Sequence, residues 1–213
     1  LFGPDVVRDP TYPTKFNILV GSGDREKPLN VYGAAASVQN YFFSVVDVPT
    51  QADWLVDDIA TADALCGTNI ICLAALTPVT TDGVASGATL AAKGWRFALD
   101  PGEQVVTGAI TVSDIASLST HIAAQPTDAC EANLGIATTY NLDYAKGDGE
   151  KNTIVKGGLV PTPVAGIVIL DSGEEVPFCI GCGGEDSAIG AKIVGSGITW
   201  TQPKSRVYWN IQQ

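Results

Sequence analysis

Five cysteines carry the most reactive side chains of the sequence, namely Cys66, Cys72, Cys130, Cys179 and Cys182. Their spacing must decide between disulfide, metal and redox chemistry. Cys179 and Cys182 have the C-x-x-C spacing of redox pairs and of half zinc sites. The sequence holds no second C-x-x-C and only one histidine, and Gly183 stands where a c-type haem motif needs histidine. A structural disulfide or free thiols are therefore favoured, and no haem is implied.

The other cysteines fit the same interpretation. Cys66 and Cys72 bracket a short Gly-Thr-Asn turn before an apolar stretch, a layout suited to a disulfide in an oxidising compartment. We predict a Cys66–Cys72 disulfide. The odd count leaves one thiol free or paired outside the sequence.

Hydrolytic chemistry has little support. His121 is the only base of its kind, its neighbours are apolar, and no Gly-x-Ser-x-Gly motif is present, so a Ser-His-Asp triad is not favoured. Glycoside hydrolysis needs two facing carboxylates, whereas adjacent residues face apart. The acidic pairs, which we interpret as solvated loop residues, are Asp57-Asp58, Glu174-Glu175 and Glu185-Asp186. The sequence thus predicts no catalytic, cofactor-binding or metal-binding residues.

A glycine-rich turn contains Gly21, Gly23, Asp24 and Arg25. Phosphate loops of this kind continue with Lys-Ser/Thr and a helix, and Arg25-Glu26-Lys27-Pro28 supplies neither. We predict a structural turn in which the glycines adopt positive φ and Asp24 or Arg25 bonds the neighbouring backbone.

The four tryptophans could form a carbohydrate-binding or adhesive surface with the tyrosines. Trp95 and Trp209 lie in predicted strands and are expected in the core. Trp54 and Trp200 are the better candidates for a contact surface.

The charge balance excludes some partners. A net charge of -11 repels nucleic acid and anionic lipid headgroups. No apolar run reaches the 18 to 20 residues or so that span a bilayer, so we expect no membrane insertion. Because the sequence has no methionine and begins with Leu1, we expect the start of translation and any signal peptide to lie upstream.

Short runs rich in β-branched and aromatic residues alternate with Gly, Pro and Asp turns, which predicts an all-β, mostly antiparallel fold of the sandwich, barrel or propeller type. A short helix or loop is predicted over 53–64, and the strands at 164–170 and 175–180 are predicted to form a hairpin around the turn at 171–174. The predicted strands cover 15–20, 38–46, 94–99, 104–111, 115–123, 137–144, 164–170, 175–180 and 206–211. Those at 94–99, 104–111 and 115–123 are expected to be successive antiparallel neighbours.

Three ordered stretches resemble the PilY family of type IV pilus tip and biogenesis proteins. The first stretch is NILVGSGDREKPL at 17–29, followed by VQNYFF at 38–43 and Asp47. The second combines KGWRFAL at 93–99, PGEQVVT at 101–107, Cys130, YNLDY at 140–144 and Gly147. The third combines GGLVP at 157–161, Pro163, VPF at 176–178 and RVYW at 206–209.

The resemblance implies a partial β-propeller of quinoprotein-like shape with long loops. Residues 1–213 would be its C-terminal part, and the remaining blades would lie upstream of Leu1. It also implies a non-enzymatic role as a tip, adhesin or assembly protein. The expected partners are the rest of the propeller, minor pilins and the pilus tip complex, outside the cell or in the periplasm during assembly.

The family's calcium loop has no match here, because DYAKGD at 143–148 has the wrong spacing and only two carboxylates. Calcium is therefore expected only in the missing part of the propeller. Two alternatives stay open: a quinoprotein-type propeller enzyme and a structural subunit of another extracellular filament.

Overall fold

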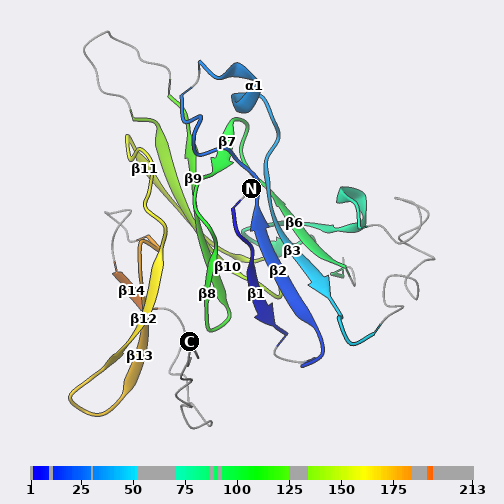
Figure 1. The fold of residues 1–213 in the computed structure, drawn as a ribbon, viewed down its shortest axis with the longest axis vertical. Coiled ribbons are helices and arrows are strands. Elements are labelled where there is room, and N and C mark those ends of the chain that lie inside the picture. The colour runs from blue at the N-terminus through cyan, green and yellow to red at the C-terminus, as the bar shows by residue number, and fades with distance from the viewer. Residues whose placement is uncertain are drawn as a thin grey trace, which may run out of the picture.

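The computed structural model describes residues 2–9, 12–29, 31–51, 71–86, 89–90, 93–124, 134–183 and 191–193. This part of the chain is predominantly β and mostly antiparallel (Figure 1), as the sequence predicts. Its helical content is a single turn, α1 (Gly33–Ala36), and one 3-10 turn at Leu73–Ala75. Neither helical segment of these residues has the length or the apolar character of a membrane span.

The largest sheet has six strands in the order β1-β2-β3-β6-β4-β5. The pair β4–β6 is parallel, and the other pairs of this sheet are antiparallel. Its strands are β1 (Asp5–Arg8), β2 (Phe16–Gly21), β3 (Tyr41–Asp47), β4 (Thr77–Thr80), β5 (Gly83–Val84) and β6 (Gly94–Ala98).

A second sheet has five strands, with β11-β10-β9-β7 in order and β8 paired to the same β9. A third sheet has three strands in the order β12-β13-β14. The strands of the second sheet are β7 (Glu103–Val105), β8 (Ile110–Val112), β9 (Ile115–Ile122), β10 (Ile136–Asp143) and β11 (Gly149–Val155). Those of the third are β12 (Val164–Ile169), β13 (Glu175–Ile180) and β14 (Ala191–Ile193).

The six-stranded and five-stranded sheets share one hydrophobic core. Alternate residues of β2 and β3 are buried, the pattern of strands with one face against a core. Trp95 donates its indole N–H to the carbonyl of Tyr144 at 2.9 Å, and the rings of Phe97 and Tyr140 meet edge to face at 5.3 Å. These contacts join the two sheets, and Trp95, 1% exposed, is a core residue as predicted.

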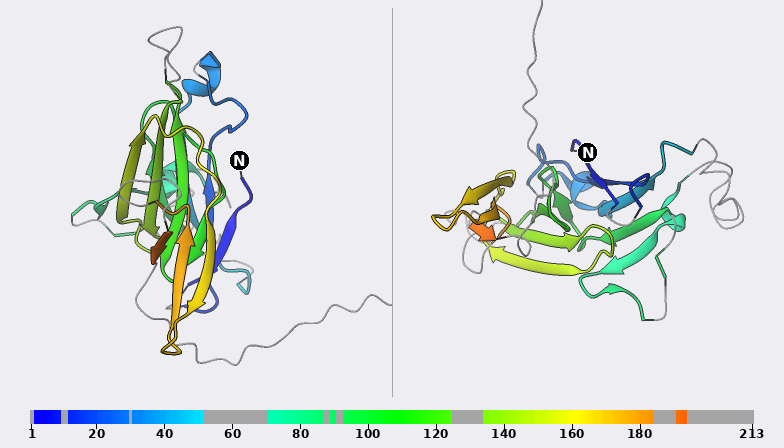
Figure 2. Two further views of the ribbon diagram at one scale, coloured as in Figure 1. Left: turned by 90° about the vertical axis from the view of Figure 1, so that its left-hand side faces the viewer. Right: turned by 90° about the horizontal axis from the view of Figure 1, so that it is seen from below.

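The three-stranded sheet extends away from this double layer. The hairpin of β12 and β13 projects from one end of the molecule in every view (Figures 1 and 2). Its strands pair antiparallel from Val164 opposite Ile180 to Ile169 opposite Glu175. The hairpin predicted around the turn at 171–174 is therefore confirmed.

The prediction of one continuous strand over 104–111 is wrong. The chain forms β7, leaves the ladder, and re-enters it as β8, both against β9. The hydroxyl of Thr107 accepts the amide of Ser119 at 2.9 Å, so a side chain takes the place of a backbone partner there. The expected run of three neighbouring strands is also wrong, because β6 pairs with β3 and β4 in the other sheet.

The partial propeller stays a prediction. The described strands form sheets of six, five and three strands and no closed barrel or ring of blades. The segments predicted at 53–64 and 206–211 lie outside the described residues.

Candidate functional site

The glycine-rich turn lies where the two large sheets meet. It follows β2 of the six-stranded sheet and packs on β7 of the five-stranded sheet. A Cβ on Gly21 would stand 2.6 Å from the side chain of Val105, and one on Gly23 would stand 2.2 Å from the Val105 carbonyl oxygen. Neither glycine has positive φ, so the predicted conformational reason is wrong. Both positions need glycine because another strand approaches closely.

Hydrogen bonds fix this turn to β7 and the residue after it. The amide of Val105 donates to the carbonyl of Ser22 at 3.0 Å, and the amide of Asp24 donates to Oε1 of Gln104 at 2.9 Å. The guanidinium of Arg25 donates to the carbonyl of Val106 at 3.1 Å. We call Gly21 to Arg25 the sheet joint, because it ties the two layers of the core together.

Asp24 makes further contacts with the residues that follow it. Its carboxylate accepts the amide of Glu26 at 3.2 Å and forms an ion pair with Lys27 at 3.0 Å. The hydrogen bond from Lys27 lowers the pKa of Asp24. The side chains of the joint are thus engaged within the fold, and the geometry supports a structural role.

A buried carboxylate lies close to the joint, and sequence reasoning missed it. Glu103 is 0% exposed, and its carboxylate accepts the hydroxyls of Thr120 and Tyr140 and the amide of Asp100 at 2.9 Å. Burial, then the charge of Glu103, raises the pKa of Tyr140. In the sequence, Glu103 directly follows an Asp-Pro-Gly turn. Nothing in that pattern predicts that its side chain is buried.

His121 is a core histidine. It is 3% exposed, and its Nε2 lies 2.8 Å from the carbonyl oxygen of Leu134. A Cβ on Gly135 would stand 2.4 Å from the same nitrogen, so the chain closes tightly over the ring. Within the part of the chain that the structure describes, no group of three or more His, Cys, Asp or Glu side chains is placed to hold a metal.

Three of the five cysteines, Cys72, Cys179 and Cys182, lie among the described residues. Cys179 and Cys182 are bonded, with Cα atoms 5.6 Å apart, a usual spacing for a disulfide. Both are buried and pack against Ile110, Val112 and Ile115. The bond therefore anchors the base of the projecting hairpin against β8 and β9.

Cys72 is also disulfide-bonded, and its partner lies outside the described residues. The predicted Cys66–Cys72 pairing thus stays a prediction. The other predicted residues that lie outside the described part of the chain are Cys66, Cys130, Trp54, Trp200, Trp209, Asp57, Asp58, Glu185 and Asp186.

The projecting hairpin carries the clearest candidate contact surface. We call residues 164–180 the apolar hairpin. Residues that face each other in an antiparallel pair lie on the same side of the sheet, and the register therefore defines two faces. The outer face consists of Val164, Gly166, Val168, Val176, Phe178 and Ile180, without one polar side chain. Val164 is 62% exposed and Val168 is 44% exposed.

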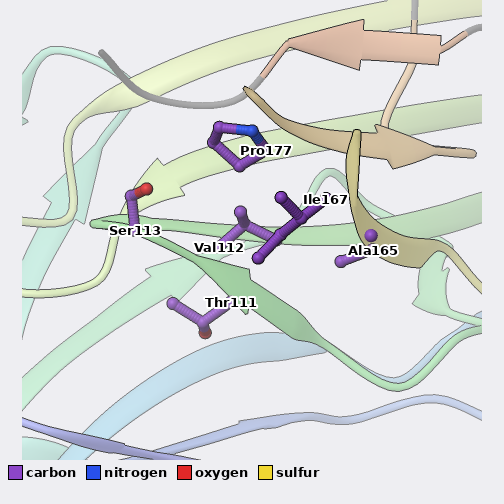
Figure 3. Close-up of a pocket in the computed structure, with 7 residues that line it drawn as sticks. Thr111, Val112, Ser113, Ala165, Ile167 and Pro177 are labelled. Carbon is purple, nitrogen blue, oxygen red and sulfur yellow. The ribbon is translucent and has the colours of Figure 1, made fainter. Parts of the chain in front are cut away.

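The inner face of the apolar hairpin borders a pocket of about 450 Å³. Ala165, Gly166, Ile167 and Pro177 line it from the hairpin, and Thr111 and Val112 of β8 and Ser113 of the following turn line it from the other side (Figure 3). The hydroxyls of Thr111 and Ser113 are buried without a hydrogen-bond partner among the described residues. The pocket is therefore a mainly apolar hollow between the hairpin and β8.

The hairpin tip is acidic. Asp171 and Glu174 are exposed at the turn, and Glu175 follows them. No lysine or arginine occurs from residue 157 to residue 183. The apolar surface thus ends in a small region of negative charge.

Comparison with known proteins gives limited results. No protein-family model matches the sequence, and no curated protein matches it. Among solved structures, the chain is similar to the crystal structure of the Pseudomonas aeruginosa PilY1 C-terminal domain, with a TM-score of 0.48 and 14% sequence identity. The likeness covers 82% of this chain and 42% of that one, so this chain spans less than half of that chain's length. A likeness at this level establishes neither family membership nor function.

Proposed function

We propose that this chain is a non-enzymatic part of a type IV pilus-associated protein, and that it acts through protein contacts at the cell surface or in the periplasm. The observation that carries the contact role is the apolar hairpin. Exposed apolar patches of this kind mark interaction sites on soluble domains. The assignment to pili rests on the three ordered PilY-like stretches of the sequence.

The described chemistry is consistent with a contact role. The buried titratable side chains Glu103 and His121 are hydrogen-bonded within the core, and the sheet joint is hydrogen-bonded to β7. Disulfides such as Cys179–Cys182 persist in oxidising compartments, which supports placement outside the cytoplasm. The propeller architecture, the adhesin role and the position at the pilus tip are parts of the same proposal.

Binding to minor pilins tests this proposal. Purified protein is immobilised, and soluble domains of the minor pilins and of the major pilin from the same organism are passed over it. We expect saturable binding of at least one minor pilin, with the major pilin as the matched control. Absence of binding to every minor pilin would refute the pilus assignment.

The quinoprotein alternative has a separate assay. Purified protein is incubated with pyrroloquinoline quinone and calcium, and dye reduction on alcohols is followed. We expect no dye reduction above the rate without protein. Clear reduction of the dye would refute the non-enzymatic proposal. The filament alternative predicts a repeating assembly of this chain without pilin contacts.

A further inference from the structure

We infer that the edge of β12, which no other described strand than β13 pairs, accepts an extended, mostly apolar segment of a partner protein, with lysine or arginine at the end that lies beside the hairpin tip. This inference rests on the proposed function, because it names the chemistry of the contact that the proposal requires. It concerns a surface whose backbone, side chains and charge each restrict what can bind.

The backbone selects an extended partner. Among the described strands, β12 pairs with β13 alone and lies at the edge of its sheet. Its six register pairs with β13 run without a bulge. Edge strands are normally protected by charged residues, proline or bulges, and residues 164–170 contain no charged residue and no proline. An unprotected edge of this kind is suited to strand addition, in which main-chain hydrogen bonds supply affinity.

The side chains select an apolar partner. β12 exposes apolar groups on both of its faces, with Val168 on the outer face and Ile167 and Ile169 on the inner face, each more than 40% exposed. An added strand would place its own alternate side chains beside both sets. Those on the inner side would point toward the pocket between Ile167 and Val112, which has room for a valine or leucine side chain.

Charge selects the end of the partner that lies at the tip. β12 runs toward the turn that carries Asp171 and Glu174, and Glu175 begins the return strand. Antiparallel pairing, the slightly more stable arrangement, puts the N-terminal end of the added strand beside these acids. Basic residues are therefore expected at that end. A second copy of this chain is disfavoured as the occupant, because each copy carries a net charge of -11.

A synthetic peptide tests the inference directly. The probe has two lysines followed by six residues of alternating valine and threonine, and its binding to the full chain is followed by fluorescence anisotropy. We expect saturable binding that becomes about tenfold weaker when glutamates replace the lysines, a change of roughly 1.4 kcal/mol. Prolines in place of the threonines should abolish binding, since proline cannot extend the ladder. Equal binding of the proline peptide would overturn the inference.

Matched variants locate the site. Ile167→Asp puts a charge on the edge and the pocket, and Val155→Asp makes the same change on β11, the edge strand of another sheet, where Val155 is 72% exposed. We expect Ile167→Asp to weaken peptide binding at least tenfold and Val155→Asp to leave it unchanged. Ala165→Leu fills the pocket without adding charge, and it should weaken binding even if the aspartate variant fails to fold. Unchanged binding by the leucine variant would contradict entry of a partner side chain into the pocket.

Two further outcomes separate this inference from the proposed function. If the Ile167→Asp variant folds and still binds minor pilins at wild-type strength, the inference fails and the pilus assignment stands. If the peptide binds at β12 but no minor pilin binds, the site stands and the pilus assignment fails. A dimer of the wild-type chain that Ile167→Asp dissociates would assign the edge to a second copy and overturn the inference.

Discussion

The close approach of Gly23 to Val105 makes a strong prediction about stability. Alanine at position 23 would place its Cβ 2.2 Å from the Val105 carbonyl oxygen and 2.6 Å from its nitrogen. Backbone atoms cannot give way as a flexible side chain can. The turn would therefore have to move off β7, and the hydrogen bonds of the sheet joint would be lost.

The size of the effect follows from these bonds. Two neutral hydrogen bonds, made by the amides of Val105 and Asp24, contribute about 1 kcal/mol each, and the charged donor Arg25 contributes about 1.5 kcal/mol. The Gly23→Ala variant should lose about 3 to 4 kcal/mol of unfolding free energy. With an m-value of about 3 kcal/mol/M, the urea midpoint falls by about 1 M or slightly more.

Urea unfolding followed by tryptophan fluorescence measures this loss. The control is Gly33→Ala, because Gly33 has ordinary φ and nothing within 4 Å of the added Cβ, and alanine suits its place in α1. That variant should change stability by no more than about 1 kcal/mol, in the stabilising direction. If Gly23→Ala is as stable as wild type, the joint does not hold the sheets together.

Three further predictions concern buried groups. Glu103→Gln should cost about 2 kcal/mol, because an amide cannot accept all the bonds that the carboxylate accepts, and should lower the melting temperature by about 4 to 8 °C, whereas the exposed Glu174→Gln should leave it unchanged. The pKa of Tyr144 is raised to about 12 from 10.0, chiefly by burial, so the stability it contributes is complete below pH 10 and is lost as the pH rises toward 12. Tyr144→Phe should remove that part of the alkaline loss in urea midpoints measured from pH 8 to 12, and an identical pH profile would contradict the assignment. Replacing both Cys179 and Cys182 by alanine should cost about 2 kcal/mol, the loop-closure contribution of a short loop, and should speed hydrogen exchange in β13; unchanged exchange would show that the bond does not anchor the hairpin.

Local patterns in the sequence predict much of the fold. The alternation in β2 and β3, the tip of the apolar hairpin and the core position of Trp95 depend on neighbouring residues, and the sequence contains that information. The failure at 104–111 has a different origin, because Thr107 leaves the ladder to bond Ser119 of another strand. Pairing partners of β6 and β7 depend likewise on contacts between distant segments.

The candidate site was less accessible from the sequence. The turn at Gly21 to Arg25 could be recognised, but its reason, the approach of Val105, appears only when the two sheets are assembled. The apolar run in β12 reads as an ordinary buried strand, and only the register and the edge position show it to be exposed. The burial of Glu103 results from Thr120 and Tyr140, which no local pattern connects to it.

The central claim is that the apolar hairpin is a contact surface for pilus proteins, and cross-linking mass spectrometry on the native protein in its own cells tests it most directly. We predict carbodiimide cross-links between lysines of minor pilins and the exposed tip carboxylates Asp171 and Glu174 that disappear in cells carrying Ile167→Asp and persist with Val155→Asp. Cross-links to minor pilins that are unaffected by Ile167→Asp, or the absence of any pilin among the cross-linked proteins, would contradict the claim.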